Sequence, residues 1–224
     1  MKKLLFWMVL IVGIVALIGS CAKKDEESAA TAAATAAADN TTSTTSYIST
    51  TTTASGSITM GDDTLSGVYA SECLTSASTI AFFKATGFWA SEVNAYGQVF
   101  VVTGSDNISI ELYAFTDTSC SNLSQCQKTV SDNVTFGSAS GSNYPVTYNN
   151  QTQALTVHTT AAETALETLY SNALDFIVGT PIELPVSGSG LRYGLWTLSG
   201  TTWYEASSSS ATPTSAGTVP HVKQ

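Results

Sequence analysis

Short runs of apolar residues that alternate with polar ones dominate the chain from residue 58 onward, and turn-forming residues separate the runs. Within residues 107–114, for example, apolar side chains occupy the even-numbered positions and polar ones the odd-numbered positions. This period of two is typical of a half-buried antiparallel strand. The same reasoning predicts strands at residues 65–70, 79–84, 88–94, 98–103, 108–115, 127–136, 146–148, 154–159, 174–179, 182–186, 191–198 and 201–206.

One segment has a helical pattern instead. Thr160 followed by Glu163 matches a capping box, in which the threonine side chain caps the first turn and the glutamate reaches back to the cap. Apolar residues then recur at helical spacing as far as Ala173. We therefore expect one short helix that begins at Thr160 and interrupts the series of strands.

Three pairs of predicted strands form hairpins. Their turns lie at residues 104–106, 149–151 and 199–200, where glycine, serine, aspartate, asparagine or glutamine separates the alternating runs. A long series of short strands separated by such turns predicts an all-β domain with one short helix. Connection hairpin by hairpin favours an antiparallel up-and-down barrel, with a sandwich as the alternative.

The amino terminus carries a different pattern. Two lysines precede an apolar run at residues 4–18, which is shorter than the ~20 residues that span a bilayer. Ile18, Gly19 and Ser20 then lead to Cys21, and this arrangement resembles the lipobox of bacterial lipoproteins. The resemblance implies that a signal peptidase cleaves before Cys21 and that its thiol carries lipid. An uncleaved membrane helix and a plain secretory signal are the alternatives.

The lipoprotein resemblance also bears on localisation and on the plan of the chain. Residue 22 is alanine rather than the aspartate that retains lipoproteins at the inner membrane, so we expect export to the cell envelope and anchoring in the outer membrane. Alanine, threonine and serine fill the next stretch, which cannot bury enough apolar surface to become ordered. The predicted plan is a signal peptide at residues 1–20, a lipidated disordered tether at 21–57, an all-β domain at 58–206 and a loosely ordered tail at 207–224.

The charge balance excludes some classes of partner. The net charge is −9, with only 8 lysines and arginines among 224 residues. Such a chain lacks the basic patch that nucleic-acid binding needs, and electrostatic adhesion to anionic lipid is excluded on the same ground. The two histidines, His158 and His221, lie far apart, and no Cys-x-x-Cys spacing occurs, so we expect no metal and no other cofactor.

Three cysteines remain if Cys21 carries lipid, and an exported protein would pair two of them. We favour a disulfide between Cys73 and Cys120, whose long loop would stabilise the fold by about 4 kcal/mol, against about 2.4 kcal/mol for the short loop between Cys120 and Cys126. Cys126 is an alternative partner for either residue, since it follows Cys120 closely.

The folded part loosely resembles the small lipocalin-like barrels of bacterial lipoproteins. The resemblance lies in Gly67-Val-Tyr-Ala before Cys73, in Asp117-Thr-Ser-Cys120, and in the late strand Arg192-Tyr-Gly-Leu-Trp196. The Gly-x-Trp that usually opens such barrels is Gly67-Val-Tyr69 in this chain. The resemblance implies a barrel that carries a small apolar molecule.

Catalytic patterns do not appear, so we expect no enzyme. The string at residues 186–190 lacks the Gly-x-Ser-x-Gly spacing of a nucleophile elbow. Our first hypothesis is a binding module for a small apolar ligand, and the alternative is a structural or protein-interaction lipoprotein of the envelope with a filled interior. The candidate ligand-binding residues lie in predicted strands and are Trp89, Tyr113, Arg192, Tyr193, Trp196 and Trp203.

Overall fold

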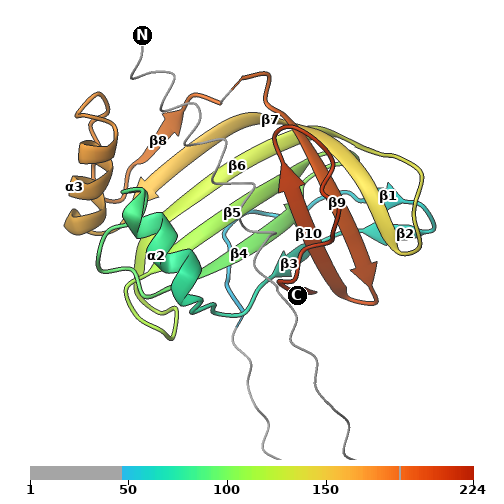
Figure 1. The fold of residues 1–224 in the computed structure, drawn as a ribbon, viewed down its shortest axis with the longest axis horizontal. Coiled ribbons are helices and arrows are strands. Elements are labelled where there is room, and N and C mark those ends of the chain that lie inside the picture. The colour runs from blue at the N-terminus through green and yellow to red at the C-terminus, as the bar shows by residue number, and fades with distance from the viewer. Residues whose placement is uncertain (1–46, 187) are drawn as a thin grey trace, which may run out of the picture.

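Eight antiparallel strands close into an up-and-down barrel in the computed structural model of this chain, which describes residues 47–186 and 188–224 (Figure 1). Successive strands are neighbours, in the order β3, β4, β5, β6, β7, β9, β10, β11 and back to β3, while β8 pairs only with β7. The predicted all-β barrel is therefore confirmed. The elements are β1 (Ile58–Met60), β2 (Asp63–Leu65), β3 (Val68–Ala70), α2 (Ala77–Ala85), β4 (Ala95–Val102), β5 (Ile108–Phe115), β6 (Leu123–Phe136), β7 (Asn143–Val157), α3 (Thr160–Leu169), β8 (Pro181–Leu184), β9 (Leu191–Ser199), β10 (Thr202–Ser208) and β11 (His221–Lys223).

The long strand β7 contradicts one predicted turn. It pairs with β6 along most of its length, with β9 through its first half and with β8 near its end. The sequence predicts a turn at residues 149–151, but the strand continues through them. The register shifts opposite Val130 and Ser131, which is the mark of a β-bulge. The Asn-Asn-Gln run therefore accommodates an extra residue within a continuous strand instead of reversing the chain.

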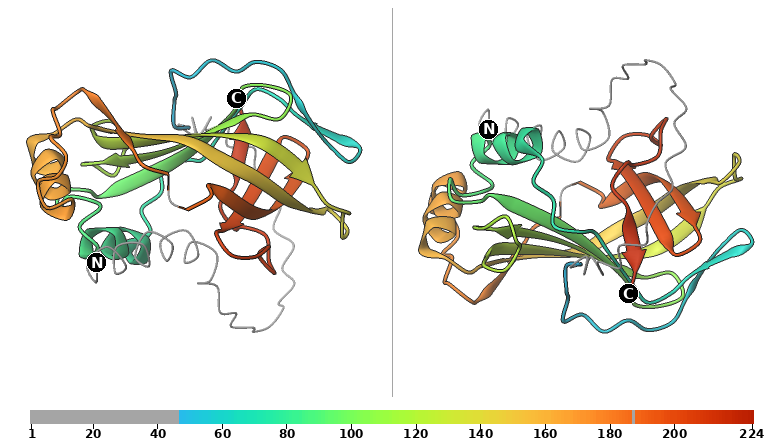
Figure 2. Two further views of the ribbon diagram at one scale, coloured as in Figure 1. Left: turned by 90° about the horizontal axis from the view of Figure 1, so that it is seen from above. Right: turned by 90° about the horizontal axis from the view of Figure 1, so that it is seen from below.

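The predicted strands at residues 79–84, 88–94 and 174–179 are wrong. The first lies within helix α2, and the other two form turns and irregular segments. α2 buries Ile80 and Phe83, whose spacing of three places them on one helical face. The helix packs on one face of the sheet where β4 begins and β5 ends (Figure 2). The described residues thus contain two helices, where the sequence predicts one.

Helix α3 is the helix that the capping pattern predicts. The cap lies one residue earlier than expected, because the Thr159 hydroxyl, not that of Thr160, accepts a hydrogen bond from the Ala162 amide at 3.1 Å. Ala162 and Leu166 are buried against Leu155 of β7. Neither of the two helices in the described part of the chain is long and apolar enough to cross a membrane.

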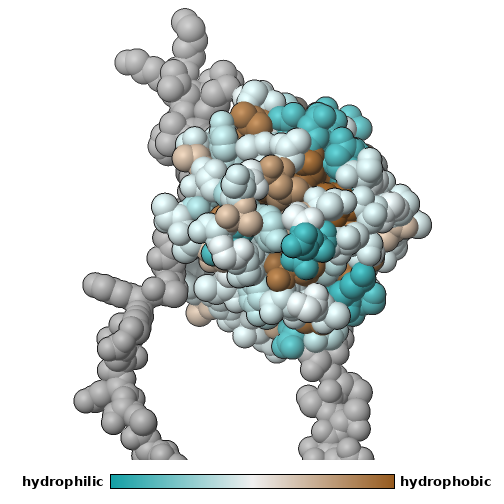
Figure 3. Space-filling model, turned by 90° about the vertical axis from the view of Figure 1, so that its right-hand side faces the viewer, coloured by the Kyte–Doolittle hydropathy of each residue, from teal (hydrophilic) through white to brown (hydrophobic). Residues whose placement is uncertain are grey.

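Large aromatic side chains fill the barrel between its walls. The hairpin of β1 and β2 covers one end of this cluster and adds apolar side chains to it. From the side of that hairpin, the surface is mostly polar with small, separate apolar areas (Figure 3). The buried cluster includes Tyr69, Phe100, Tyr148, Trp196 and Trp203 from the barrel strands and Ile58, Met60 and Leu65 from the hairpin.

The carboxyl terminus is a structural part of the barrel, so the prediction of a loosely ordered tail at residues 207–224 is wrong. β10 extends to Ser208, and β11 lies between β10 and β3, where it completes the barrel. The chain between them packs closely on β10, since a Cβ atom on Gly217 would lie 1.9 Å from the Glu205 carbonyl oxygen. A three-residue strand is too short to show a periodic pattern, which is why the sequence does not reveal it.

The predicted boundary between tether and domain also lies too late. Residues 47–57, which we call the strap, run across the outer wall of the barrel and contact β4 and β5. Ile48 in the strap is buried, although the composition around it predicts disorder. The predicted signal peptide at residues 1–20, the predicted lipidation site Cys21 and the predicted tether as far as residue 46 lie outside the described residues.

Protonation of His221 is expected to weaken the barrel in acid. The side chain is 1% exposed, with its ring nitrogens 3.3 Å from the Trp203 carbonyl oxygen and the Gln98 amide oxygen. Burial lowers the pKa of His221 to about 4, whereas an unfolded histidine titrates near 6.5. The neutral form therefore stabilises the fold above pH 6.5, and that contribution is lost as pH falls towards 4. Urea unfolding should show a loss of about 2 kcal/mol between pH 7 and pH 5.

A His221→Gln variant provides the matched control for this pH dependence. Glutamine retains an amide that can hydrogen-bond at this position but has no ionisable group. Whatever the variant's stability at pH 7, its free energy of unfolding should fall less between pH 7 and pH 5 than that of the unmodified chain, because the contribution of His221 is absent. Equal pH dependence in the two proteins would contradict the expectation.

Candidate functional site

The structure does not bring the predicted ligand-binding residues together. Trp196 and Trp203 lie in the barrel interior, and Arg192 shares that face because it lies four residues from Trp196 on the same strand. Tyr193 lies on the opposite face of β9. The remaining two are elsewhere: Trp89 is buried with α2, and Tyr113 lies on the outer wall of β5.

The interior aromatic residues contact one another closely. The ring centroids of Trp196 and Trp203 are 4.6 Å apart, and the same distance separates Phe100 from Trp203. Tyr69 packs edge-on against Trp203 with a centroid distance of 5.4 Å. Each of these side chains is at most 1% exposed. They form a packed core, and their contacts are of the kind that stabilises a protein interior.

A groove of about 300 Å³ lies instead on the outer wall, beside the strap. Its volume is at the lower end of the range for small-molecule sites. The lining side chains are aromatic, aliphatic or uncharged polar. They come from the strap (Tyr47, Ile48 and Ser49), from β5 (Tyr113 and Phe115) and from the segment that enters β6 (Cys120, Ser121 and Leu123). Tyr113 is thus the one candidate residue from the sequence that lines this groove.

Gly97, in the middle of β4, leaves the space into which Ile48 of the strap packs. A Cβ atom on Gly97 would lie 2.2 Å from the Cγ1 atom of Ile48, so only a bare α-carbon leaves room for that side chain. The amide of Ile48 donates a hydrogen bond to the Ser71 carbonyl oxygen at 3.1 Å, and Tyr47 pairs with Glu72 in an isolated bridge. The start of the strap is therefore fitted to the barrel wall by shape and by backbone pairing.

A buried carboxylate holds the middle of the strap. Glu111 of β5 is 2% exposed and accepts hydrogen bonds from the hydroxyls of Thr50 at 2.6 Å, Tyr113 at 2.5 Å, and Thr52. The Lys128 ammonium lies 3.9 Å from Glu111 and donates to the Thr52 hydroxyl at 2.7 Å. A buried carboxylate is costly unless it is paired, so these donors make Glu111 a stable attachment point for the strap.

The same carboxylate fixes the role of Tyr113. Burial and the hydrogen bond to Glu111 both raise the pKa of Tyr113 far above its ordinary value. The phenol therefore stays protonated and donates to Glu111, which holds this lining residue of the groove in place. The ring of Phe115 is stacked on that of Tyr113, with centroids 6.3 Å apart.

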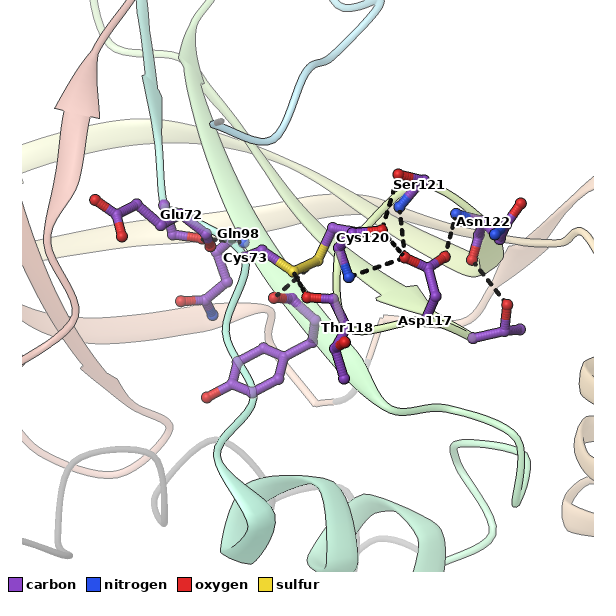
Figure 4. The surroundings of a disulfide bond; sticks show 12 residues. Glu72, Cys73, Gln98, Asp117, Thr118, Cys120, Ser121 and Asn122 are labelled. Atoms are coloured by element: carbon purple, nitrogen blue, oxygen red, sulfur yellow. Dashed lines mark hydrogen bonds between the residues drawn. A yellow bond between two sulfur atoms is a disulfide. The ribbon is translucent and has the colours of Figure 1, made fainter. Parts of the chain in front are cut away.

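The predicted disulfide between Cys73 and Cys120 is present and supports the far wall of the groove (Figure 4). Asp117 organises the loop around Cys120, because it accepts hydrogen bonds from the amides of Ser121 at 3.1 Å and Asn122 at 2.6 Å. Hydrogen bonds from the Ser119 hydroxyl and from these backbone amides stabilise the charged carboxylate and hold the pKa of Asp117 well below its usual range. The loop thus presents Cys120 and Ser121 to the groove in a fixed position.

Cys126, the alternative disulfide partner, is a free, half-buried thiol in the described structure. It lies on β6 directly opposite Tyr113. Burial and the nearby charge of Glu111 raise the pKa of Cys126 to about 12, so the thiol stays protonated and is a poor nucleophile. A protonated thiol exchanges slowly with disulfides, which protects the Cys73–Cys120 bond from exchange with Cys126.

Two features of this site escape the sequence reasoning, and only the first of them leaves a signal in the sequence. Gly97 interrupts an apolar strand, which is a known sign of a close approach by another segment. Glu111 is an acid within an alternating strand, where a solvated surface role is the ordinary expectation. The described residues contain no cluster of three or more side chains suited to holding a metal. No model of a known protein family matches this chain, and no curated protein is significantly similar to it.

Proposed function

We propose that this chain is a lipid-anchored protein of the bacterial cell envelope whose barrel binds a small, largely apolar ligand on its outer wall. The groove beside the strap carries this proposal. Its volume of about 300 Å³ suits a small molecule, and two tyrosines, a phenylalanine, an isoleucine and a leucine line it without any charged side chain. A neutral, flat or aromatic ligand would gain most from these surfaces.

The position of the groove fits a protein held by its amino terminus. Tyr47 lines the groove and directly follows the segment that would link the barrel to the lipid on Cys21. An outer-membrane anchor would therefore place the groove where the tether meets the barrel. The disulfide between Cys73 and Cys120 supports export, because such bonds persist in oxidising compartments. In this proposal the protein binds and does not catalyse.

A role in protein interaction is the second candidate, and one observation favours it. Ile177 and Val178, in the loop before β8, are 54% and 44% exposed. Neighbouring exposed apolar side chains are a common feature of protein contact sites. A partner that binds there would leave the groove beside the strap empty.

Titration with the neutral fluorescent probe N-phenyl-1-naphthylamine tests the groove. We expect the full chain to bind the probe, and a Ser121→Trp variant to bind it at least 10-fold more weakly, because the indole would fill the groove. Ser121 is exposed, so the change removes no core side chain. Ser138→Trp, in the exposed loop between β6 and β7, is the matched control and should bind like the unmodified chain. Equal binding by both variants, or no binding by the unmodified chain, would reject the groove as the site.

A further inference from the structure

The groove and the strap depend on each other. Three of the residues that line the groove, Tyr47, Ile48 and Ser49, belong to the strap. If the strap leaves the barrel, the groove loses that wall and becomes an open surface of β5 and the disulfide loop. A ligand that needs all the walls therefore binds only to the form in which the strap is docked.

Among the described residues, the backbone of the strap is hydrogen-bonded to the barrel only near its two ends. The amide of Ile48 bonds to Ser71, and the amide of Ser55 bonds to the Val102 carbonyl oxygen at 2.9 Å. Within the described part of the chain, no backbone–backbone hydrogen bond ties residues 49–54 to the barrel. The threonine hydroxyls on Glu111 make the attachment between the two ends. Segments with few backbone bonds and little buried apolar surface are the ones that open locally at low cost.

The composition of the strap also indicates that it can leave the barrel at low cost. Residues 49–57 consist of serine, threonine, alanine and glycine, as in much of the preceding tether. Ile48 is the only buried large apolar side chain in the strap. Ordering eleven residues costs conformational entropy that this burial and a few hydrogen bonds offset only narrowly. Any further contact, such as a ligand in the groove, shifts the balance towards the docked form.

We propose that the strap is a ligand-stabilised latch, so that occupancy of the groove sets how firmly residues 47–57 are held on the barrel. This proposal rests on the proposed function of the groove. A ligand that binds only the docked form stabilises it by mass action. Release of the strap would add its length to the tether, at most ~40 Å when fully extended. Binding would thus draw the barrel closer to its membrane anchor.

Residue-resolved hydrogen exchange on the full chain tests the latch with N-phenyl-1-naphthylamine as the ligand. The amides of Ile48 and Ser55 report opening of the strap, because both are bonded to the barrel. At a probe concentration ten times its dissociation constant, their exchange should slow by about 10-fold. The Ser121→Trp variant, in which the groove is filled, should show no such slowing. Binding of the probe without any change in these two amides would overturn the latch and leave the groove in place.

A substitution at Gly97, which does not itself line the groove, loosens the strap at Ile48. In Gly97→Ala the new methyl group displaces Ile48, so we expect exchange at Ile48 and Ser55 to be about 10-fold faster and the probe to bind more weakly. Gly137→Ala is the control, because its Cβ atom would make only an ordinary contact with Pro145 at 3.6 Å. Faster exchange with unchanged probe affinity would also overturn the latch. If the unmodified chain binds no probe at all, the proposed function fails, and the latch fails with it.

Discussion

Replacing Trp203 by alanine is expected to lower the free energy of unfolding by about 3–5 kcal/mol. Trp203 is fully buried and contacts Tyr69, Phe100 and Trp196, with centroid distances of 5.4, 4.6 and 4.6 Å. Removing the indole deletes all these contacts and leaves a cavity that the β-strands around it can close only partly. Urea unfolding followed by circular dichroism measures the loss.

The control for this variant lies on the same strand. Tyr204 follows Trp203 but faces outward and is half-buried, so Tyr204→Ala should cost much less. The comparison also bears on function. If Trp203→Ala cost under about 1 kcal/mol, the interior would not behave as a packed core. The barrel interior would then have to be reconsidered as a place for a ligand.

The sequence predicts correctly those strands whose alternation of apolar and polar residues is visible within the strand itself. In β5 the apolar and polar residues alternate along the sequence, so the strand is visible within a single short segment. The segment around residues 79–84 carries a short apolar run that fits a strand and a helix equally well. The segment forms a helix because Ile80 and Phe83 then pack together against the sheet. The sequence of the segment alone does not reveal that contact.

The parts that escape prediction depend on distant partners. The strap has a low-complexity sequence, yet it packs specifically on the barrel. Ile48 fits against Gly97 of β4. Thr50 and Thr52 donate hydrogen bonds to Glu111, about sixty residues further along the chain. β11 is a strand only because β3 and β10 leave a gap between them. The sequence therefore does not reveal the groove, although the aromatic ring of Tyr113 makes this residue a candidate. Loop-closure entropy disfavours the short Cys120–Cys126 loop and so favours a disulfide to Cys73, but it does not choose between Cys120 and Cys126 as the partner of Cys73.

Removing the disulfide in a Cys73→Ser, Cys120→Ser variant is expected to lower the free energy of unfolding by about 4 kcal/mol. The bond joins residues 47 positions apart and so encloses α2, β4 and β5, and restricting a loop of that length in the unfolded chain contributes about this much. Cys126→Ser is the matched control: it removes a half-buried thiol that closes no loop, and should change stability far less.

The same pair of variants separates two roles of the disulfide. Asp117 holds its loop through amide hydrogen bonds that do not involve sulfur, so part of the groove wall should survive without the bond. If the groove is the binding site, the double variant should bind N-phenyl-1-naphthylamine more weakly even under conditions where it remains folded, since Cys120 is no longer tied to Cys73. Unchanged affinity in the folded variant would mean that the disulfide stabilises the barrel and contributes nothing to the shape of the groove. A stability loss below about 1 kcal/mol would mean that the loop between these cysteines is already restricted in the unfolded chain.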